Sequence, residues 1–507
     1  MIGTFSLLMG LSFLFSVIAL LVLIWSFSRS WLGMGPSASH VLFENIRKPE
    51  AEEIKLSDRF PENIIFDQSV AKVSRYLFAS SLFWLIIGSV AGLIASLKFN
   101  FPDWLTSNPE LTFGRIRPLH LNLVAYGWVS MCGMAISLWL IPRLTRRSLI
   151  GSSVATLGTH LWNMGLIFGS FALLFGWTDG VEWLEFPWPV DSLFVIGGAL
   201  IGLPVLLTIQ QKKVDHLYVS VWYIGAAFVW FPFLFLVANL PIFFGAQHAI
   251  VNWWYAHNVL GLWITPMGLA AAYYLIPKII GRPVYSYQIS LLGFWGLALF
   301  YSQVGIHHLI GGPVPTWLVS LSIVTSVMMF LPVLAVAVNH HMTVGQNWSA
   351  VKKSPTLQFI VFGAMMYTVV SAQGSLMALR SVNQVTHFTH YTIGHAHLGV
   401  YGFFSFIAFG ACYFMVPRLL AKDWPHPRLI KLHFWSAVIG ISIYVIGLSI
   451  GGVIQGQMMM NSTVSFSESV AATKPYLWAR SVGGVLMTLS HCIFGYHYYL
   501  LSRASRK

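Results

Sequence analysis

The chain has 507 residues, of which 56% are hydrophobic and only 9% are charged. Soluble domains carry roughly 25% charged residues, so this composition excludes an ordinary soluble protein and indicates an integral membrane protein. The formal net charge of +13 lies largely in short loops, where it indicates membrane orientation and not nucleic-acid binding. The three cysteines form no Cys-x-x-Cys motif, which excludes covalent c-type haem and a cysteine zinc site in this chain.

Apolar runs long enough to cross a bilayer recur along the chain. The first, at about 5–28, predicts an N-terminal anchor, and a polar stretch follows it to residue 76. Twelve further spans are predicted at 77–97, 119–142, 150–177, 190–208, 217–240, 249–277, 286–310, 315–342, 356–379, 390–417, 431–456 and 476–502. We therefore expect an all-α membrane protein: a bundle of 12 helices over 77–507, preceded by a segment 1–76 with one extra transmembrane helix.

Basic residues occur in every second loop of this predicted bundle. They are Arg143, Arg146 and Arg147, Lys212 and Lys213, Lys278 and Arg282, Lys352 and Lys353, and Arg418, Lys422 and Arg428. The positive-inside rule assigns these loops to the cytoplasm. The spans from 119, 249 and 390 then enter the membrane from outside, which fixes the depth of every residue along them.

Six histidines on four spans are predicted at one depth, in the outer part of the membrane. They are His120, His257, His307, His308, His395 and His397. Each alone could be a packing or interfacial residue, but a shared layer of imidazoles suits iron or copper. His395 and His397 are two positions apart, so on an α-helix their side chains point about 200° from each other. The span from 390 could therefore serve two metal centres, one on each side.

The motifs around these histidines resemble those of a known family. The stretches 112–120, 253–258, 282–287 and 392–397 are similar to those of the catalytic subunit of the C-family, cbb3-type, haem-copper oxidases. The similarity covers about 75–502, with the motifs in family order. The bundle is then expected to be the haem-copper oxidase catalytic domain.

The resemblance implies a cofactor role for each histidine, with two b-type haems and one copper ion (CuB). His120 and His397 would bind the iron of a low-spin haem b, and His395 would be the proximal ligand of a high-spin haem. The copper ligands would be His257, His307 and His308.

The resemblance also implies a redox-active phenol, Tyr301, linked covalently to a copper-ligand histidine, His257 by analogy. Nitric oxide reductases place a glutamate near the position of Gly261. Gly261 together with Tyr301 therefore favours a dioxygen reductase over a nitric oxide reductase, which stays the alternative. A packing role for Tyr301 is also open, as is a non-enzymatic transporter that would lack haem.

Three hydroxyl side chains lie on the cytoplasmic side of Tyr301 and resemble the family's proton-uptake path: Tyr273, Tyr287 and Ser290. Hydroxyls can both donate and accept hydrogen bonds, as proton transfer requires. Interfacial tyrosines are the alternative. Gln373 departs from the family, which usually has a glutamate there, and an amide cannot titrate.

Charged residues flank the predicted haem region on the outer side. Arg115 and Arg117 suit haem propionates. Glu182 and Glu185 match family carboxylates of a propionate and calcium region, with ordinary loop charges as the alternative. The segment 1–76 resembles a small assembly protein of the oxidase, fused to the chain.

The activity implied is that of a cytochrome c oxidase. Such a subunit reduces dioxygen to water with electrons from cytochrome c and translocates protons. Because the chain has no c-type haem motif, membrane-bound cytochrome c subunits are expected as partners. The expected location is the bacterial inner membrane, where the chain crosses the lipid bilayer many times.

Overall fold

The computed structural model describes residue 42 and residues 61–504. Within these residues the chain is a bundle of helices without strands, apart from one isolated bridge between Val181 and Leu184. Twelve helical segments are long and apolar enough to cross a membrane, and they confirm the twelve predicted spans. The predicted anchor at about 5–28 lies outside the described residues.

The helical elements follow one another along the chain with short connections. They are α3 (Pro61–Leu97), η2 (Pro109–Leu111), α4 (Phe113–Asn122), η3 (Leu123–Ser130), α5 (Met131–Thr145), α6 (Ser152–Phe175), α7 (Trp188–Gln210), α8 (Val219–Ala238), α9 (Ala246–Val259), η4 (Leu260–Ile264), α10 (Thr265–Ile280), α11 (Tyr287–Phe300), η5 (Tyr301–Leu309), α12 (Thr316–Met328), α13 (Phe330–Gly345), α14 (Trp348–Lys353), α15 (Pro355–Met377), α16 (Arg380–Thr386), α17 (His390–His397), η6 (Leu398–Ser405), α18 (Phe406–Leu420), α19 (Arg428–Met459) and α20 (Phe466–Arg503).

The helix α3 begins earlier than predicted, at Pro61 and not near residue 77. Its first turns carry charge, which the hydropathy pattern assigned to a polar linker, but Val70 and Val73 on them are fully buried. Asp67 forms an ion pair with Arg143 of α5, and both side chains are largely buried. A buried carboxylate and guanidinium must be paired to offset their desolvation, so this contact holds the extension of α3 against the bundle.

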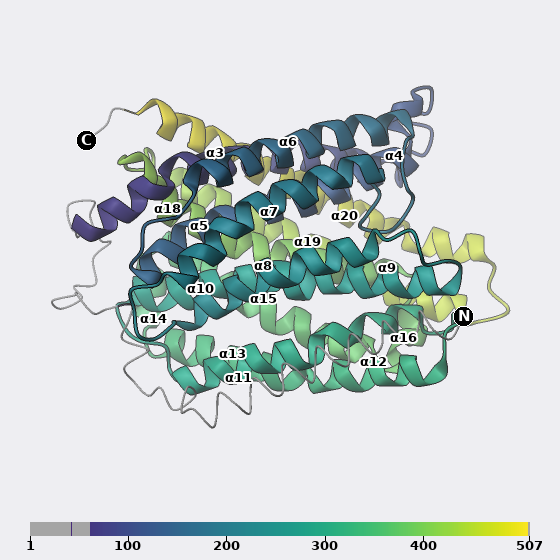
Figure 1. Cartoon of the computed structure of the whole chain (residues 1–507). Helices are drawn as coiled ribbons and strands as arrows, with labels where there is room; N and C mark the ends of the chain where they lie inside the picture. Colours follow the sequence, from purple (N-terminus) through teal and green to yellow (C-terminus); the bar gives the residue numbers. More distant parts are fainter. Residues whose placement is uncertain (1–41, 43–60, 505–507) are drawn as a thin grey trace.

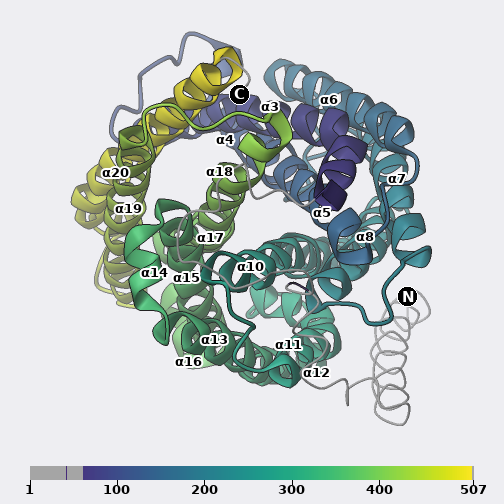
Figure 2. The ribbon, with the colours of Figure 1, turned by 90° about the vertical axis from the view of Figure 1, so that its left-hand side faces the viewer.

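Three spans form the centre of the bundle (Figure 2). They are the continuous segments Phe113–Thr145, Ala246–Ile280 and His390–Leu420, buried over 94%, 89% and 89% of their most apolar windows. In the other nine described spans this share lies between 39% and 67%. The central spans carry four of the six predicted ligand histidines, which therefore lie away from lipid.

Each central span changes helix type beside its histidine. The π-helical segments η3, η4 and η6 begin three residues after His120, His257 and His395. A π segment inserts one extra residue into an α-helix and often marks a functional site. It rotates the following residues relative to the histidine, so both can face the middle of the bundle.

The three central spans also end alike. Each has a proline followed by a basic residue, at 142–143, 277–278 and 417–418. Each then closes with a left-handed residue whose N–H bonds to the proline carbonyl: Arg146, Gly281 and Ala421. The short helix α14, which carries Lys352 and Lys353, lies at one end of the bundle and α16 lies at the other (Figure 1). Basic loops thus share one end, as the predicted orientation requires.

Candidate metal and haem centres

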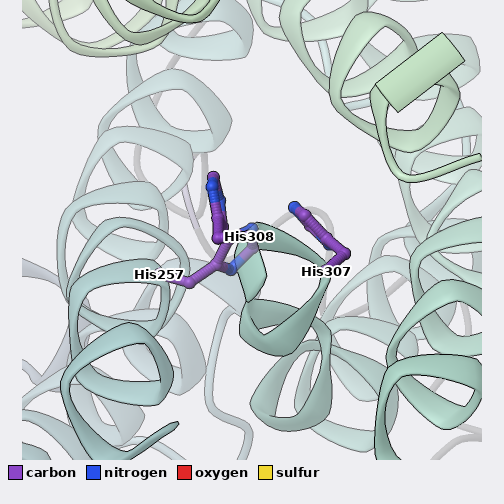
Figure 3. A group of neighbouring side chains, drawn as sticks. All are labelled: His257, His307 and His308. Atoms are coloured by element: carbon purple, nitrogen blue, oxygen red, sulfur yellow. The ribbon is translucent and has the colours of Figure 1, made fainter. Parts of the chain in front are cut away.

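Three histidine side chains meet between α9 and η5 (Figure 3). One ligand nitrogen from each of His257, His307 and His308 lies within 4.8 Å of the others. Of the described residues, only these form a group of three or more side chains that could hold a metal ion. Three imidazoles without a thiolate or carboxylate suit copper, iron or zinc.

Hydrogen bonds from α12 orient His307. Its backbone N–H donates to Ser322 Oγ at 2.8 Å, and its Nδ1 lies 3.0 Å from Ser326 Oγ. Ser326 donates its own hydrogen to the Ser322 carbonyl oxygen at 2.7 Å. Nδ1–H of His307 is therefore the donor to Ser326, which leaves Nε2 as the free lone pair that can bind a metal.

Tyr301 packs against this histidine group. Its ring centroid lies 4.9 Å from that of His257. A Cβ atom added at Gly261 would lie only 1.7 Å from Tyr301 Cε1. The phenol thus occupies the space that a side chain at 261 would need, and the two cannot be present together in this arrangement.

His120 and His397 face one another across a second gap. Their rings are nearly parallel, 14° apart, with centroids separated by 6.1 Å. A single metal ion between two ring nitrogens, with metal–nitrogen distances of about 2 Å, requires a similar separation. Nδ1 of His120 bonds to the Gly88 carbonyl and Nδ1 of His397 to the Ile393 carbonyl, at 2.8 and 2.9 Å. Nε2 of each ring therefore keeps the lone pair that a metal needs, and in this structure that of His397 accepts a hydrogen bond from Tyr444 Oη.

The surroundings of this pair also fit a haem. A Cβ atom at Gly92 would lie 2.5 Å from His120 Nδ1, so glycine allows α3 to pack directly on the imidazole. Arg480 of α20 is 8% exposed, and its Nε and Nη1 have no hydrogen-bond partner among the described residues. Arg480 lies within electrostatic range of both His120 and His397. A buried guanidinium with free donors suits a propionate carboxylate.

His395 points away from His397, as the two-residue spacing predicts. Its Nδ1 lies 3.1 Å from Gln373 Oε1 on α15. His397 instead contacts Tyr444 of α19, with Oη to Nε2 at 3.2 Å. The amide oxygen of Gln373 can only accept, so Nδ1 of His395 carries the hydrogen and Nε2 is free to bind iron.

The charged residues predicted on the outer side form ion pairs and hydrogen bonds within the protein. Arg117 pairs with Glu182 at 2.7 Å, and Arg115 donates to the Leu174 carbonyl at 2.7 Å. Glu185 is buried and accepts a hydrogen bond from Asn122 at 2.8 Å. Burial raises the pKa of Glu185 to about 7, with a smaller contribution from the charge of Glu182. Glu182 and Glu185 do not form part of a group of three metal ligands among the described residues.

The three hydroxyl residues of the predicted proton path are buried, and Ser290 and Tyr273 lie against residues of α13. Asn339 donates to Ser290 Oγ at 2.6 Å, and His340 packs 4.4 Å from the ring of Tyr273. Tyr273 Oη and both ring nitrogens of His340 have no partner within the described part of the chain. Tyr287 donates to the Leu217 carbonyl at 2.8 Å.

Sequence reasoning missed Arg480, Asn339, His340 and Ser326. The signal for the first three was available, because each is a strongly polar side chain inside a predicted span, and such residues are commonly functional. Ser326 carries no comparable signal, since serine bonds readily to its own helix in any span.

Comparisons with known proteins agree with this geometry. The family model for cytochrome c and quinol oxidase polypeptide I matches residues 72–486. The cbb3-type cytochrome c oxidase subunit CcoN1 of Stutzerimonas stutzeri is 31% identical over 452 residues, covering 86% of this chain and 95% of that protein. A cytochrome c oxidase subunit 1 homolog of Agrobacterium tumefaciens is 32% identical, with coverage of 84% and 82%.

A solved haem-copper terminal oxidase dimer has the same fold, with a TM-score of 0.66 and 16% identity over 89% of this chain and 85% of that one. Haem and copper are therefore the cofactors that the family implies, in a multi-pass membrane protein. The chain belongs to the cytochrome c and quinol oxidase polypeptide I family, as a cbb3-type subunit I of the haem-copper oxidases.

Proposed function

We propose that this chain is the catalytic subunit of a cbb3-type cytochrome c oxidase of a bacterial inner membrane. It would reduce dioxygen to water with electrons that arrive from cytochrome c through membrane-bound cytochrome c subunits, and it would translocate protons. The observation that carries this proposal is the packing of Tyr301 into the space beside Gly261, next to the three-histidine group.

The proposed ligand roles rest on the placement of the six histidines: one group of three, one facing pair, and His395 on the opposite side of its helix from His397. His120 and His397 would hold a low-spin haem b, and His395 a second, high-spin haem b. Copper would be held by His257, His307 and His308. When bound, these groups supply electron transfer and dioxygen activation. The protein's own part is to fix each imidazole through its Nδ1 partner, as for His307 and His395.

Tyr301 would act at its hydroxyl. The phenol can give up one proton and one electron there, and both would be restored by uptake from the cytoplasm and from cytochrome c. Its ring lies close enough to His257 for the covalent link that the resemblance implies. The proton would reach it through Tyr287, Ser290 and Tyr273, with Asn339 and His340 completing the path.

The outer charges would serve the haem propionates and a cation. Arg480 is the best placed for a propionate, because its Nε and Nη1 have no partner among the described residues and it lies near both low-spin ligands. Arg115 and Arg117 would approach propionates at the surface. Glu182 and Glu185 would bind calcium together with propionate oxygens.

The nitric oxide reductase alternative is disfavoured by one contact. A glutamate near position 261, which would help to hold non-haem iron, cannot share its space with the Tyr301 ring. Metal analysis of the purified complex separates the two readings: one copper per chain supports the oxidase, and non-haem iron in its place supports the reductase. A protein without haem absorption would point to a transporter.

Dithionite-reduced minus oxidised spectra of two variants test the haem assignment. His397→Ala should remove the low-spin haem signal, because six-coordinate iron needs both imidazoles. His395→Ala should retain it and disturb carbon monoxide binding at the high-spin haem. His426→Ala, in the loop after α18, is the control and should change neither. Identical spectra for the two ligand variants would refute the two-sided arrangement.

Tyr301→Phe tests the phenol. The variant removes the hydroxyl and keeps the ring against Gly261, so both haems and copper should be retained while oxygen consumption falls to background. Tyr498→Phe, on α20, is the matched control and should keep wild-type turnover. Normal turnover by a fully metallated Tyr301→Phe protein would rule out the assigned role.

A further inference from the structure

A row of four polar side chains lies between α3, η6 and α20. Ser89 Oγ lies 2.7 Å from His491 Nδ1, and His491 Nε2 lies 3.1 Å from Tyr401 Oη. Tyr401 Oη in turn lies 3.2 Å from Ser490 Oγ. All but Ser89 are buried. Tyr401 is four residues after His397, about one helical turn.

The two ends of this row are fixed by backbone carbonyls. Ser89 donates to the Leu85 carbonyl oxygen at 2.6 Å, and Ser490 donates to the Met487 carbonyl oxygen at 2.6 Å. Carbonyl oxygens cannot donate. Every hydrogen in the row must therefore come from the four side chains themselves.

The hydrogens do not suffice when His491 is neutral. The row contains five contacts at hydrogen-bond distance. The two serines, the tyrosine and a neutral imidazole supply one hydrogen each, so one contact lacks a proton. An imidazolium donates from both nitrogens and completes all five bonds without moving a heavy atom.

Other titratable groups lie between this row and the end of the bundle that carries the basic loops. Phe409 packs against both His491 and His433, and Tyr413 Oη lies 3.0 Å from His433 Nδ1. His497 contacts the Pro425 carbonyl in the loop after α18. Among the described residues, Nε2 of His433 and Nδ1 of His497 have no hydrogen-bond partner. Buried imidazoles with free nitrogens are expected to bind internal water.

We infer that Ser89, His491, Tyr401 and Ser490 form a proton-binding site, which takes up one proton from the cytoplasmic side and later releases it. The incoming proton forms an N–H bond on the free nitrogen of the imidazole, and release breaks one N–H bond. His497, Tyr413 and His433 line the route. Of the described residues, the titratable groups that face His491 are Tyr401 on η6 and His433 on α19.

The inference rests on the proposed function for what drives the uptake. An electron that arrived at a haem held by His397 would add one negative charge about one helical turn from Tyr401, and opposite charges attract strongly inside a membrane protein. Binding of a proton at His491 would therefore accompany reduction. The site would link electron arrival to proton uptake on a route separate from Tyr301.

The pH dependence of the low-spin haem midpoint potential tests this link in the purified complex. In the wild type the potential should fall as pH rises. His491→Gln cannot take the extra proton, so its slope should drop to less than half of the wild-type slope, with the haem content unchanged. Ser89→Ala, which removes the acceptor for Nδ1–H, should have a smaller effect in the same direction.

Thr488→Val is the matched control, because Thr488 lies on the same helix and, among the described residues, its hydroxyl bonds to the Gly484 carbonyl alone. Its slope should equal that of the wild type. Reduced-minus-oxidised infrared spectra of protein with labelled histidine should also lose an imidazolium band in His491→Gln. Unchanged slope and bands in both variants would overturn the inference, whereas a wild type without low-spin haem would overturn the proposed function.

Discussion

The imidazole ring of His307 is oriented by the Ser326 hydroxyl, which accepts from its Nδ1–H. Loss of such a partner to a metal-bound histidine typically weakens metal binding about 10- to 100-fold. Ser326→Ala should therefore lose copper at chelator concentrations that the wild type withstands. Copper content after dialysis against a graded chelator series measures this. Thr325→Val is the control, since Thr325 bonds to carbonyls of its own helix, and equal copper retention in Ser326→Ala would contradict the role.

Glu185 makes stability depend on pH. Its pKa is raised from 4.5 to about 7 in the folded protein, so the folded state binds a proton more tightly than the unfolded state does. The contribution of this protonation to the stability of the folded protein is fully present below pH 4.5 and is lost as pH rises through 7. Glu185→Gln should flatten the thermal stability profile across this window, measured in calcium-free detergent solution. Asp103→Asn, in an exposed loop, should leave the profile unchanged.

At the scale of helices, two tryptophans tie the π segments of the central spans together. Trp263 of η4 donates to Ser130 Oγ at 2.9 Å, and Trp128 of η3 donates to Ser405 Oγ at 2.8 Å. Each serine donates to a carbonyl five residues earlier in its own π segment. One hydroxyl thus supports the local helix type and joins two spans.

Ser405→Ala should consequently leave the indole N–H of Trp128 buried and unpaired. An unsatisfied buried donor costs about 1–3 kcal/mol, so the unfolding temperature in detergent should fall. Ser137→Ala on α5 removes an equally buried hydroxyl and should cost less, because within the described part of the chain this hydroxyl bonds to the Gly133 carbonyl alone. Equal destabilisation by both would mean that the link between spans contributes little.

The π segments themselves were not predicted. Hydrophobic periodicity cannot detect them, because residues on these spans are buried on every side and the pattern has no polar face to shift. A local signal exists in the sequence: 123–130 and 398–405 share leucine, tyrosine, glycine and serine at the same positions. It is too short to recognise as a repeat without the structure.

For the whole molecule, hydropathy predicted the twelve spans, and the positive-inside pattern predicted one shared depth for six histidines. Both patterns can be read along the sequence without knowing how the helices pack. What they could not give is which spans lie inside, since His257 and Asn339 look alike as polar residues in apolar runs. The charged start of α3 was missed because its burial depends on Arg143, a residue on another helix. The roles of Tyr273, Tyr287 and Ser290 stay predictions.

The contact between Gly261 and Tyr301 also constrains how such a chain can change over generations. A larger residue at 261 cannot be accepted while the aromatic ring remains, because its first carbon would overlap that ring. Replacement of Tyr301 by a smaller residue first would remove the phenol before another group could take over its role. With either order of substitution the intermediate protein would be impaired. The residues at positions 261 and 301 are therefore expected to change together.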